Sequence, residues 1–182
     1  KYKHIFSGGG VTVDEVSGSV FVFAEKYRWP ANPPPPTVYR SADHGKTWQA
    51  QETVIHPTKN GHRLTMHMAE HGITLRRGKH KGRLLRPARF YGKTGDRREN
   101  FPKMYNIAIY SDDGGKTWFP SSPFPVMGTG EGCVAELSDG RIYYDSRRHW
   151  DPPGSKYDRS MRWHAWSDDG GVTWKEPSIS KV

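Results

Sequence analysis

Cysteine and long apolar runs are scarce in this sequence. Its 182 residues contain one cysteine, Cys133, so no disulfide can form within the chain. The apolar neighbours of Cys133 predict a buried and unreactive thiol. No run of about 18 apolar residues occurs, so no helical membrane span is expected. Apolar residues at helical spacing are also nearly absent, whereas 20 glycines and 14 prolines punctuate short alternating runs, which predicts an all-β chain rich in turns.

Acidic residues are in the minority. The 19 Asp and Glu residues face 28 Lys and Arg residues, which gives a formal net charge of +9. Such a surface is either simply solvated or attracts an anionic substrate or polymer. The basic run Arg76–Lys81 lies between two predicted strands and is interpreted as an exposed hairpin tip. No nucleic-acid-binding module and no cofactor motif is recognisable, so we expect no nucleic acid partner, no cofactor and no metal.

Three copies of one eight-residue motif organise the chain. They share the pattern S-x-D-x-G-x-T-W and begin at Ser41, Ser111 and Ser167. Because the starts are 70 and then 56 residues apart, the chain is interpreted as a tandem array of one supersecondary unit. The Asp and Trp residues of the three copies are Asp43 and Trp48, Asp113 and Trp118, and Asp169 and Trp174.

The residue types of the motif are those of a β-hairpin turn. Side chains of Asp, Ser and Thr accept hydrogen bonds from nearby backbone N–H groups, and Gly adopts the positive φ that the turn needs. The Trp carries a large apolar surface into the strand that follows. Because each of these residues helps to close the hairpin, the motifs are assigned a structural role rather than ligand binding.

The motif is similar to the Asp box of sialidases and related β-propellers, and the segments between the boxes fit the same resemblance. Gly18–Glu25 resembles the sialidase strand G-x-L-x-A-F-A-E, and His71–Arg89 contains the H-G-I-x-L and G-R-L-x-x-P-A pair. Gly130–Arg147 resembles the more specific segment E-x-x-V-x-E-L-x-D-G-R-L-x-x-x-x-R. The resemblance covers nearly the whole chain and implies an all-β fold, a β-propeller.

We therefore expect three four-stranded antiparallel blades within one partial-propeller domain, over about residues 1–52, 53–122 and 123–182. Each box is expected to join the third strand of its blade to the fourth. The strands are predicted near Gly10–Val16, Ser19–Glu25, Thr37–Ser41, Trp48–Thr53, Gly72–Arg76, Arg83–Phe90, Tyr105–Ser111, Trp118–Pro120, Cys133–Leu137, Arg141–Arg147, Arg162–Ser167 and Trp174–Glu176.

Three blades do not close a ring, since single-chain propellers carry about four to eight, and the sialidase resemblance implies six. The chain is then half of a homodimer that completes a six-bladed ring, a fragment of a longer protein, or an arc with capped ends.

Propeller sites form where the loops that enter the innermost strands meet the ends of the second strands. At these positions the chain carries carboxylates and several cations. Since a guanidinium binds a carboxylate through two parallel hydrogen bonds, the arginines favour an acidic ligand. The candidate site residues are Glu70, His71, Glu131, Arg28, Arg89 and Arg147.

The resemblance implies roles for two of these residues. Glu131 matches the sialidase glutamate that polarises the nucleophilic tyrosine, and it is the predicted catalytic residue. Arg147 matches one arginine of the carboxylate-binding triad, and it is the first of the predicted substrate-binding residues. A carboxylate beside a phenol helps to remove the phenol proton, which makes tyrosine a usable nucleophile.

Other parts of the sialidase machinery are unmatched. Ser7–Gly9 occupies the place of the first triad arginine, and residues 26–42 contain no Asp or Glu to serve as the acid/base. The third arginine and the tyrosine belong to later blades of the family. Tyr143 and Tyr144 are interpreted as core or face residues of a strand.

Three functions are left open. The leading one is a sialidase-like glycoside hydrolase of the exo type, or a derivative of it, that acts on an acidic sugar. The second is a non-catalytic propeller that binds glycans or a protein partner. The third is a lyase or hydrolase of acidic polysaccharide that uses His67, His71 or Tyr91 beside an arginine clamp. The expected partner is an acidic carbohydrate, and the sialidase resemblance implies an extracellular or periplasmic location.

Overall fold

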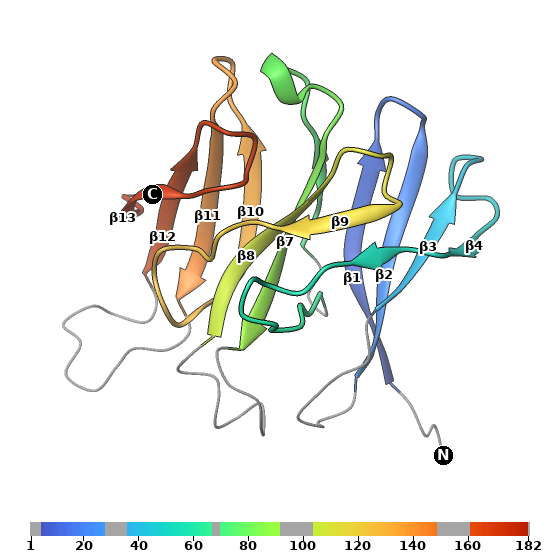
Figure 1. Ribbon diagram of the computed structural model, residues 1–182, viewed down its shortest axis with the longest axis horizontal. Helices are drawn as coiled ribbons and strands as arrows, with labels where there is room; N and C mark the ends of the chain where they lie inside the picture. The colour runs from blue at the N-terminus through green and yellow to red at the C-terminus, as the bar shows by residue number, and fades with distance from the viewer. Residues whose placement is uncertain (1–4, 28–35, 67–69, 92–103, 149–160, 182) are drawn as a thin grey trace.

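The computed structural model describes residues 5–27, 36–66, 70–91, 104–148 and 161–181. These residues form three sheets that stand side by side, in the order of the chain (Figure 1). We call them the first, middle and third blades. Apart from one 3₁₀ turn, η1 (Gly78–His80), the described elements are strands, as the sequence predicts.

The first blade has four antiparallel strands in chain order. Side chains alternate between the two faces of a strand, so Phe21 and Phe23 share one face of β2 while Val20 and Val22 share the other. The blade consists of β1 (Ile5–Asp14), β2 (Ser19–Tyr27), β3 (Thr37–Ser41) and β4 (Gln49–Gln51).

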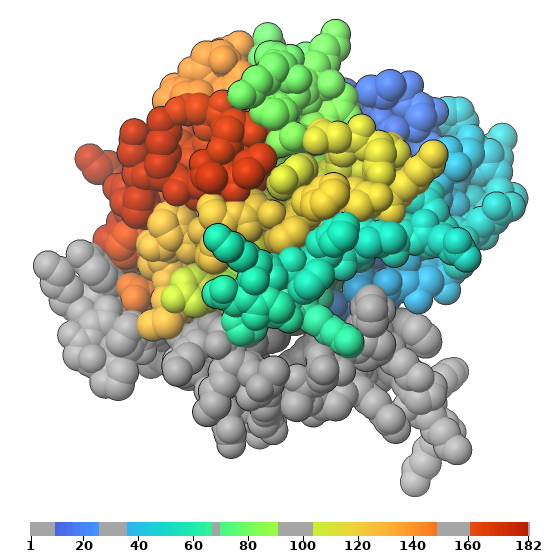
Figure 2. Space-filling model, in the orientation of Figure 1, coloured from blue at the N-terminus to red at the C-terminus, as the bar shows by residue number. Residues whose placement is uncertain are grey.

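The middle blade has the four expected antiparallel strands and one more. The extra strand, β5, pairs in parallel with the outermost strand β9, where Val54 N–H donates to the Lys116 carbonyl at 2.9 Å. Figure 2 shows this segment, in teal, lying across the middle blade. It covers a backbone edge that would otherwise be free. The blade consists of β5 (Val54–Ile55), β6 (Ile73–Thr74), β7 (Leu84–Tyr91), β8 (Met104–Ser111) and β9 (Thr117–Pro120), in the order β5–β9–β8–β7–β6.

The third blade repeats the four-stranded pattern of the first. Its innermost strand β10 contacts β7 and β8 of the middle blade. It consists of β10 (Thr129–Glu136), β11 (Ile142–Arg148), β12 (Arg162–Ser167) and β13 (Lys175–Ile179). The three sheets therefore confirm the predicted all-β architecture with its strands close to the predicted positions.

The three Asp boxes have nearly identical turn geometry. In each box the Ser Oγ accepts a hydrogen bond from the Gly N–H, at 2.8, 2.9 and 2.9 Å. The Asp Oδ1 accepts one from the Thr N–H at 2.9 Å in all three boxes. The glycines Gly45, Gly115 and Gly171 have φ of 84°, 83° and 86°, where a side chain would be strained. The boxes thus close the turns between third and fourth strands, as the sequence predicts.

The hydrophobic core lies between the blades. Phe21, Phe23 and Val38 of the first blade pack against Ile107, Ile109 and Trp118 of the middle blade. Leu85 and Ala108 on the other face of the middle blade pack with Tyr144, Ala165 and Trp174 of the third. Face-to-face stacking of blades therefore buries apolar surface on both sides of the middle blade.

The tryptophans of the boxes differ in burial. Trp118 is fully buried and Trp174 is 8% exposed, because each packs in a core between two blades. Trp48 is 41% exposed, because its face of the first blade is not covered by another blade among the described residues.

Cys133 corrects one expectation: its thiol is exposed. Along β10, Val134 points toward the middle blade, so its neighbour Cys133 points to the outer face of the third blade. Partial desolvation and the nearby Asp145 raise the pKa of this thiol.

The predicted basic hairpin tip is confirmed, since Arg76 to Lys79 are exposed around η1. Within the described parts of the chain, no helix has the length and apolar character needed to span a membrane.

Candidate functional site

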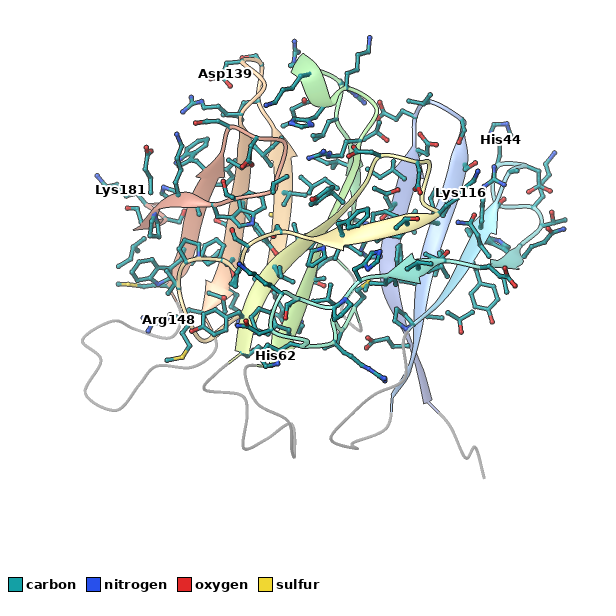
Figure 3. The ribbon with its side chains drawn as sticks, in the orientation of Figure 1. His44, His62, Lys116, Asp139, Arg148 and Lys181 are labelled. Atoms are coloured by element: carbon teal, nitrogen blue, oxygen red, sulfur yellow. The ribbon has the colours of Figure 1, made fainter. Side chains whose placement is uncertain are left out.

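The second strands of the three blades end at the edge opposite the Asp boxes. Glu25, Arg89 and Arg147 are each the seventh residue after a turn glycine, so the repeat places them at equivalent positions. Figure 3 shows Arg148 at this edge, whereas Asp139 of the hairpin tip lies at the other. The sequence-predicted site therefore gathers strand ends that the fold itself aligns.

On the third blade the structure brings Glu131 and Arg147 together. The two residues are direct partners in the β10–β11 ladder, so their side chains share a face. Arg147 Nη1 lies 3.0 Å from Glu131 Oε2, and the side chains are 52% and 31% exposed. An arginine with this exposure keeps N–H donors available to a ligand in solution.

A second ion pair borders this one. Arg162 is the ladder partner of Arg147 on β12, and its guanidinium donates to the Asp145 carboxylate. The outer face of the third blade therefore holds two arginines and two carboxylates close to the strand ends. Sequence reasoning missed Asp145 and Arg162. Asp145 precedes Arg147 by two residues on the same strand, and this period-two spacing is the signal that could have found it.

On the middle blade the structure brings Glu70 and Arg89 together. Arg89 Nη2 lies 2.7 Å from Glu70 Oε1, and these side chains are only 3% and 6% exposed. Two neighbours adjoin the pair: Thr65 exchanges two backbone hydrogen bonds of 2.8 and 3.0 Å with Arg89, and Tyr144 of the third blade lies close enough for both charges to act on its pKa. This burial favours a supporting role for the pair over direct contact with a ligand.

Arg86 and Glu25 extend this buried cluster. Arg86 is fully buried, with its guanidinium carbon 4.1 Å from the centre of the Phe23 ring. Burial lowers the pKa of Arg86 to about 10, although Glu70 and Glu25 act in the opposite direction. Glu25 Oε1 accepts a hydrogen bond of 2.9 Å from Met66 N–H. Sequence reasoning did not select Glu25 or Arg86 as a site residue. The signal that could have found Arg86 is that this charged residue interrupts the apolar residues of β7.

The structure says less about the other residues that the sequence predicts for the site. His71 is exposed and directly follows Glu70. Arg28, His67 and the side chain of Tyr91 lie outside the described residues. The roles of all the predicted site residues therefore stay predictions.

The two tyrosines of β11 confirm their interpretation as face and core residues. Tyr144 is fully buried and donates a hydrogen bond of 2.9 Å to the Ile107 carbonyl, and burial raises its pKa well above the usual value. Tyr143 donates to Asp145 at 3.3 Å, and burial is again the main cause of its raised pKa. A raised phenol pKa opposes formation of the phenolate that a nucleophile needs.

A hollow at the other edge does not coincide with these residues. It has a volume of about 650 Å³ and is lined by Asp14, Lys79, Lys81, Arg83 and Asp112 among others. Arg83 and Asp112 pair within it at 2.8 Å. Among the residues whose placement is described, no group of three or more His, Cys, Asp or Glu side chains is arranged to hold a metal ion. The candidate site therefore rests on the paired strand ends.

Comparison with known proteins gives a consistent result. Residues 6–182 match the family model of the BNR repeat-like domain. The sialidase of Micromonospora viridifaciens is 30% identical over 190 residues, which cover 97% of this chain and 27% of that protein. The sialidase of Vibrio cholerae serotype O1 is 30% identical over 125 residues, which cover 57% of this chain and 14% of that protein. The chain thus spans less than a third of the length of these curated relatives.

Solved structures show the same architecture. The Hadza microbial sialidase Hz136 superposes with a TM-score of 0.65 at 24% identity, over 96% of this chain and 33% of that one. An α-L-arabinanase of Penicillium chrysogenum superposes with a TM-score of 0.67 at 21% identity, over 98% of this chain and 53% of that one. At these identities the likeness confirms the propeller fold.

Proposed function

Because this chain belongs to the BNR repeat-like domain family, we propose that it forms part of a sialidase-like glycoside hydrolase that acts on an acidic sugar. The observation that carries the proposal is the exposed Glu131–Arg147 pair, with its 3.0 Å contact at a second-strand end. The curated relatives support it, since both are sialidases. The blade limits of 1–52, 53–122 and 123–182 are part of the same proposal.

The chemistry divides between the two residues. Arg147 binds the sugar carboxylate, because its planar guanidinium offers two parallel N–H donors to two carboxylate oxygens. Glu131 stands beside the reacting centre and takes the proton of a tyrosine nucleophile. Tyr143 and Tyr144 do not fit that nucleophile, so this role belongs to a tyrosine outside β11. Before a ligand arrives, the ion pair with Glu131 holds Arg147 in place.

A titration with N-acetylneuraminic acid, followed by calorimetry, tests the binding step. Arg147→Ala should weaken binding by about 2–3 kcal/mol, the scale of a charged hydrogen-bonded contact, which is roughly 30- to 150-fold in the dissociation constant. Arg147→Lys should recover part of it, because an ammonium cannot make the two-pronged contact.

The chain offers a matched control. Arg141 also forms an exposed ion pair, with Asp139 at 2.8 Å, but at the hairpin tip of the opposite edge. Arg141→Ala should therefore leave the affinity unchanged. Equal losses in Arg147→Ala and Arg141→Ala would mean that the ligand responds only to net charge, and would refute the proposed site.

A non-catalytic glycan-binding propeller is the second candidate. It is favoured by the segment 26–42, which contains no Asp or Glu to match the family's acid/base residue. Hydrolysis of a fluorogenic sialoside separates the two candidates. Turnover that is lost in Glu131→Gln supports the glycosidase, whereas binding without turnover supports the binding module. A uronate oligosaccharide in the same assays tests the third candidate, an enzyme of acidic polysaccharides.

The assembly that we propose for this chain is a homodimer that completes a six-bladed ring. Among the described residues no further blade covers the outer faces of the first and third blades, and a closed ring is the arrangement that protects propeller edges.

A further inference from the structure

The innermost strand of the third blade is irregular next to the Glu131–Arg147 pair. The β10–β11 ladder pairs Thr129 with Arg148, and its next pair is Glu131 with Arg147. Gly130 is thus one extra residue on β10, a β-bulge. A bulge bends its strand and changes the direction in which the neighbouring side chains point. The direction of Glu131 therefore depends on how this bulge is held.

Asn106 of the middle blade contacts both strands at the bulge. Its backbone N–H donates to Thr129 Oγ1 on β10 at 3.0 Å. Its side-chain Nδ2 donates to Ser146 Oγ on β11 at 2.6 Å. All three residues are fully buried, where the low local dielectric strengthens a hydrogen bond. One residue of β8 thus holds the two strands that carry the Glu131–Arg147 pair.

The contact continues from Ser146 to the arginine of the pair. Ser146 Oγ donates to the Arg147 carbonyl at 3.3 Å. Ser146 is also the ladder partner of Gly132, and this ladder pair lies directly beside the Glu131–Arg147 pair. A shift of the Asn106 amide would therefore move the backbone from which both side chains of the pair project.

Gly132 leaves the space that this amide occupies. A Cβ atom built on Gly132 would lie 2.7 Å from Asn106 Nδ2 and 2.6 Å from Tyr144 Cε2. Both distances are shorter than van der Waals contact, so a side chain at position 132 would push the amide away. The close approach of β8 to the bulge therefore needs a glycine on β10 as well as the asparagine.

The fold of a blade does not itself require an asparagine at this position. Counted back from the serine of each Asp box, the fifth residue is Pro36 in the first blade, Asn106 in the middle blade and Arg162 in the third. Proline has no backbone N–H to donate, so the first blade cannot make the same pair of contacts. Asn106 therefore belongs to this particular junction between the middle and third blades.

We propose that Asn106 is a positioning residue for the Glu131–Arg147 pair. It does not touch the ligand; it acts through Thr129 and Ser146, which hold the bulge and the backbone of Arg147. An arginine that is already oriented loses less conformational freedom when it binds a carboxylate. The inference rests on the proposed function for its ligand, but the positioning itself can be measured without one.

Calorimetric titration with N-acetylneuraminic acid tests the effect on binding. Asn106→Ala should raise the dissociation constant about tenfold, less than Arg147→Ala, because it loosens the arginine without removing it. Ser146→Ala removes the same hydrogen bond from its other end and should have a similar effect. Because both variants act on one contact, the double variant should bind no more weakly than Asn106→Ala alone.

Tyr144→Phe is the matched control. The Tyr144 hydroxyl donates to the Ile107 carbonyl at 2.9 Å, so this variant also removes one buried hydrogen bond between β11 and β8. It keeps the aromatic ring and does not touch the bond between Asn106 and Ser146. Tyr144→Phe should therefore lower the unfolding temperature, as Asn106→Ala does, but leave the dissociation constant of the folded protein unchanged.

A second measurement needs no ligand. The NMR order parameter of the Arg147 Nε–H group reports how firmly the guanidinium is held, and loss of the signal in Arg147→Lys identifies it. This order parameter should fall in Asn106→Ala and in Ser146→Ala, and it should stay unchanged in Tyr144→Phe.

Unchanged affinity in a folded Asn106→Ala would overturn the proposal, as would an unchanged order parameter or equal losses of affinity in Asn106→Ala and Tyr144→Phe. If Asn106→Ala does not fold, Ser146→Ala decides by the same criteria. A wild-type chain that binds no acidic sugar would refute the proposed function, and the order parameter would then decide the role of Asn106 by itself.

Discussion

Two glutamate–arginine pairs at the same edge of the molecule have different environments. Arg89 and Arg147 are both the seventh residue after a turn glycine, and each contacts a glutamate, at 2.7 and 3.0 Å. Yet the Glu70–Arg89 pair is almost completely buried, whereas the side chains of Glu131 and Arg147 are 31% and 52% exposed. The repeat therefore fixes where Arg89 and Arg147 lie, but the residues around each arginine determine whether solvent reaches its side chain.

The buried pair has two neighbours, Tyr144 of the third blade, whose pKa responds to both Glu70 and Arg89, and the segment Leu64–Met66. The backbone of this segment pairs with Arg89 through Thr65, and its Met66 N–H donates to Glu25 of the first blade. Glu25, Arg86, Glu70 and Arg89 together bring two negative and two positive charges into one buried cluster. Such a cluster links the first blade, this segment and the middle blade. The Glu131–Arg147 pair lies outside this cluster and is partly exposed, so a ligand can reach it.

The largest effect should come from breaking the buried pair. Arg89→Ala should lower the free energy of unfolding by about 3–5 kcal/mol, because it leaves the Glu70 charge buried without its partner. Arg147→Ala, at the equivalent position, should cost less than about 1 kcal/mol, since exposed ion pairs contribute little. Urea denaturation followed by tryptophan fluorescence measures both. Similar losses in the two variants would contradict the distinction drawn here between the pairs.

An intermediate effect on stability is expected from the Asp boxes. In each box the Asp carboxylate accepts hydrogen bonds from backbone N–H groups, whereas in the two ion pairs the carboxylate contacts an arginine. Asp113 Oδ1 accepts hydrogen bonds from the N–H groups of Lys116 and Thr117, at 3.0 and 2.9 Å. Asp113→Ala should lower the free energy of unfolding by about 1–3 kcal/mol, because these donors lose their acceptor. Affinity for an acidic sugar should not change, because the box lies at the other edge. A large loss of affinity in a stably folded Asp113→Ala would contradict the structural role of the boxes.

Much of the fold could be predicted because its signals are local. The glycine turns and the boxes fix both ends of many strands, so the predicted strands Thr37–Ser41 and Arg162–Ser167 match β3 and β12. The two-residue strand β5 could not be predicted, because its parallel partner β9 is a tertiary neighbour more than 60 residues away in the sequence. The exposure of Cys133 depends on which face of β10 meets the middle blade. Composition does not determine which of the alternating residues of β10 lie on that face.

The candidate site could be predicted from the sequence only in part. The convergence of Glu131 and Arg147 follows from a hairpin whose turn and register the sequence marks clearly. The burial of Glu70 and Arg89 does not, because it depends on tertiary neighbours, Thr65 and Tyr144, that no local pattern identifies. Residues at equivalent repeat positions therefore share a location but not an environment.

The smallest effect should be the acid sensitivity of the Asp boxes. Hydrogen bonds from Thr47 and Ser41 lower the pKa of Asp43 from 3.8 to about 2, and the pKa values of Asp113 and Asp169 are also lowered. A carboxyl whose pKa is lower in the folded state stabilises the fold above its unfolded pKa and loses that contribution as pH falls through the folded value. The free energy of unfolding should therefore decrease between about pH 4 and pH 2.

Asp43→Asn tests the origin of this decrease. The amide cannot titrate but keeps one oxygen acceptor for the turn, so the variant should be less stable at neutral pH and show a shallower decrease toward pH 2. Thermal unfolding at a series of pH values measures the slope. Asp139→Asn is the control from an exposed ion pair, because its pKa is lowered chiefly by hydrogen bonds with Arg141. If Asp139→Asn removed as much of the slope as Asp43→Asn, exposed surface pairs would account for the acid sensitivity, and the boxes would not be the carboxylates that stabilise this fold.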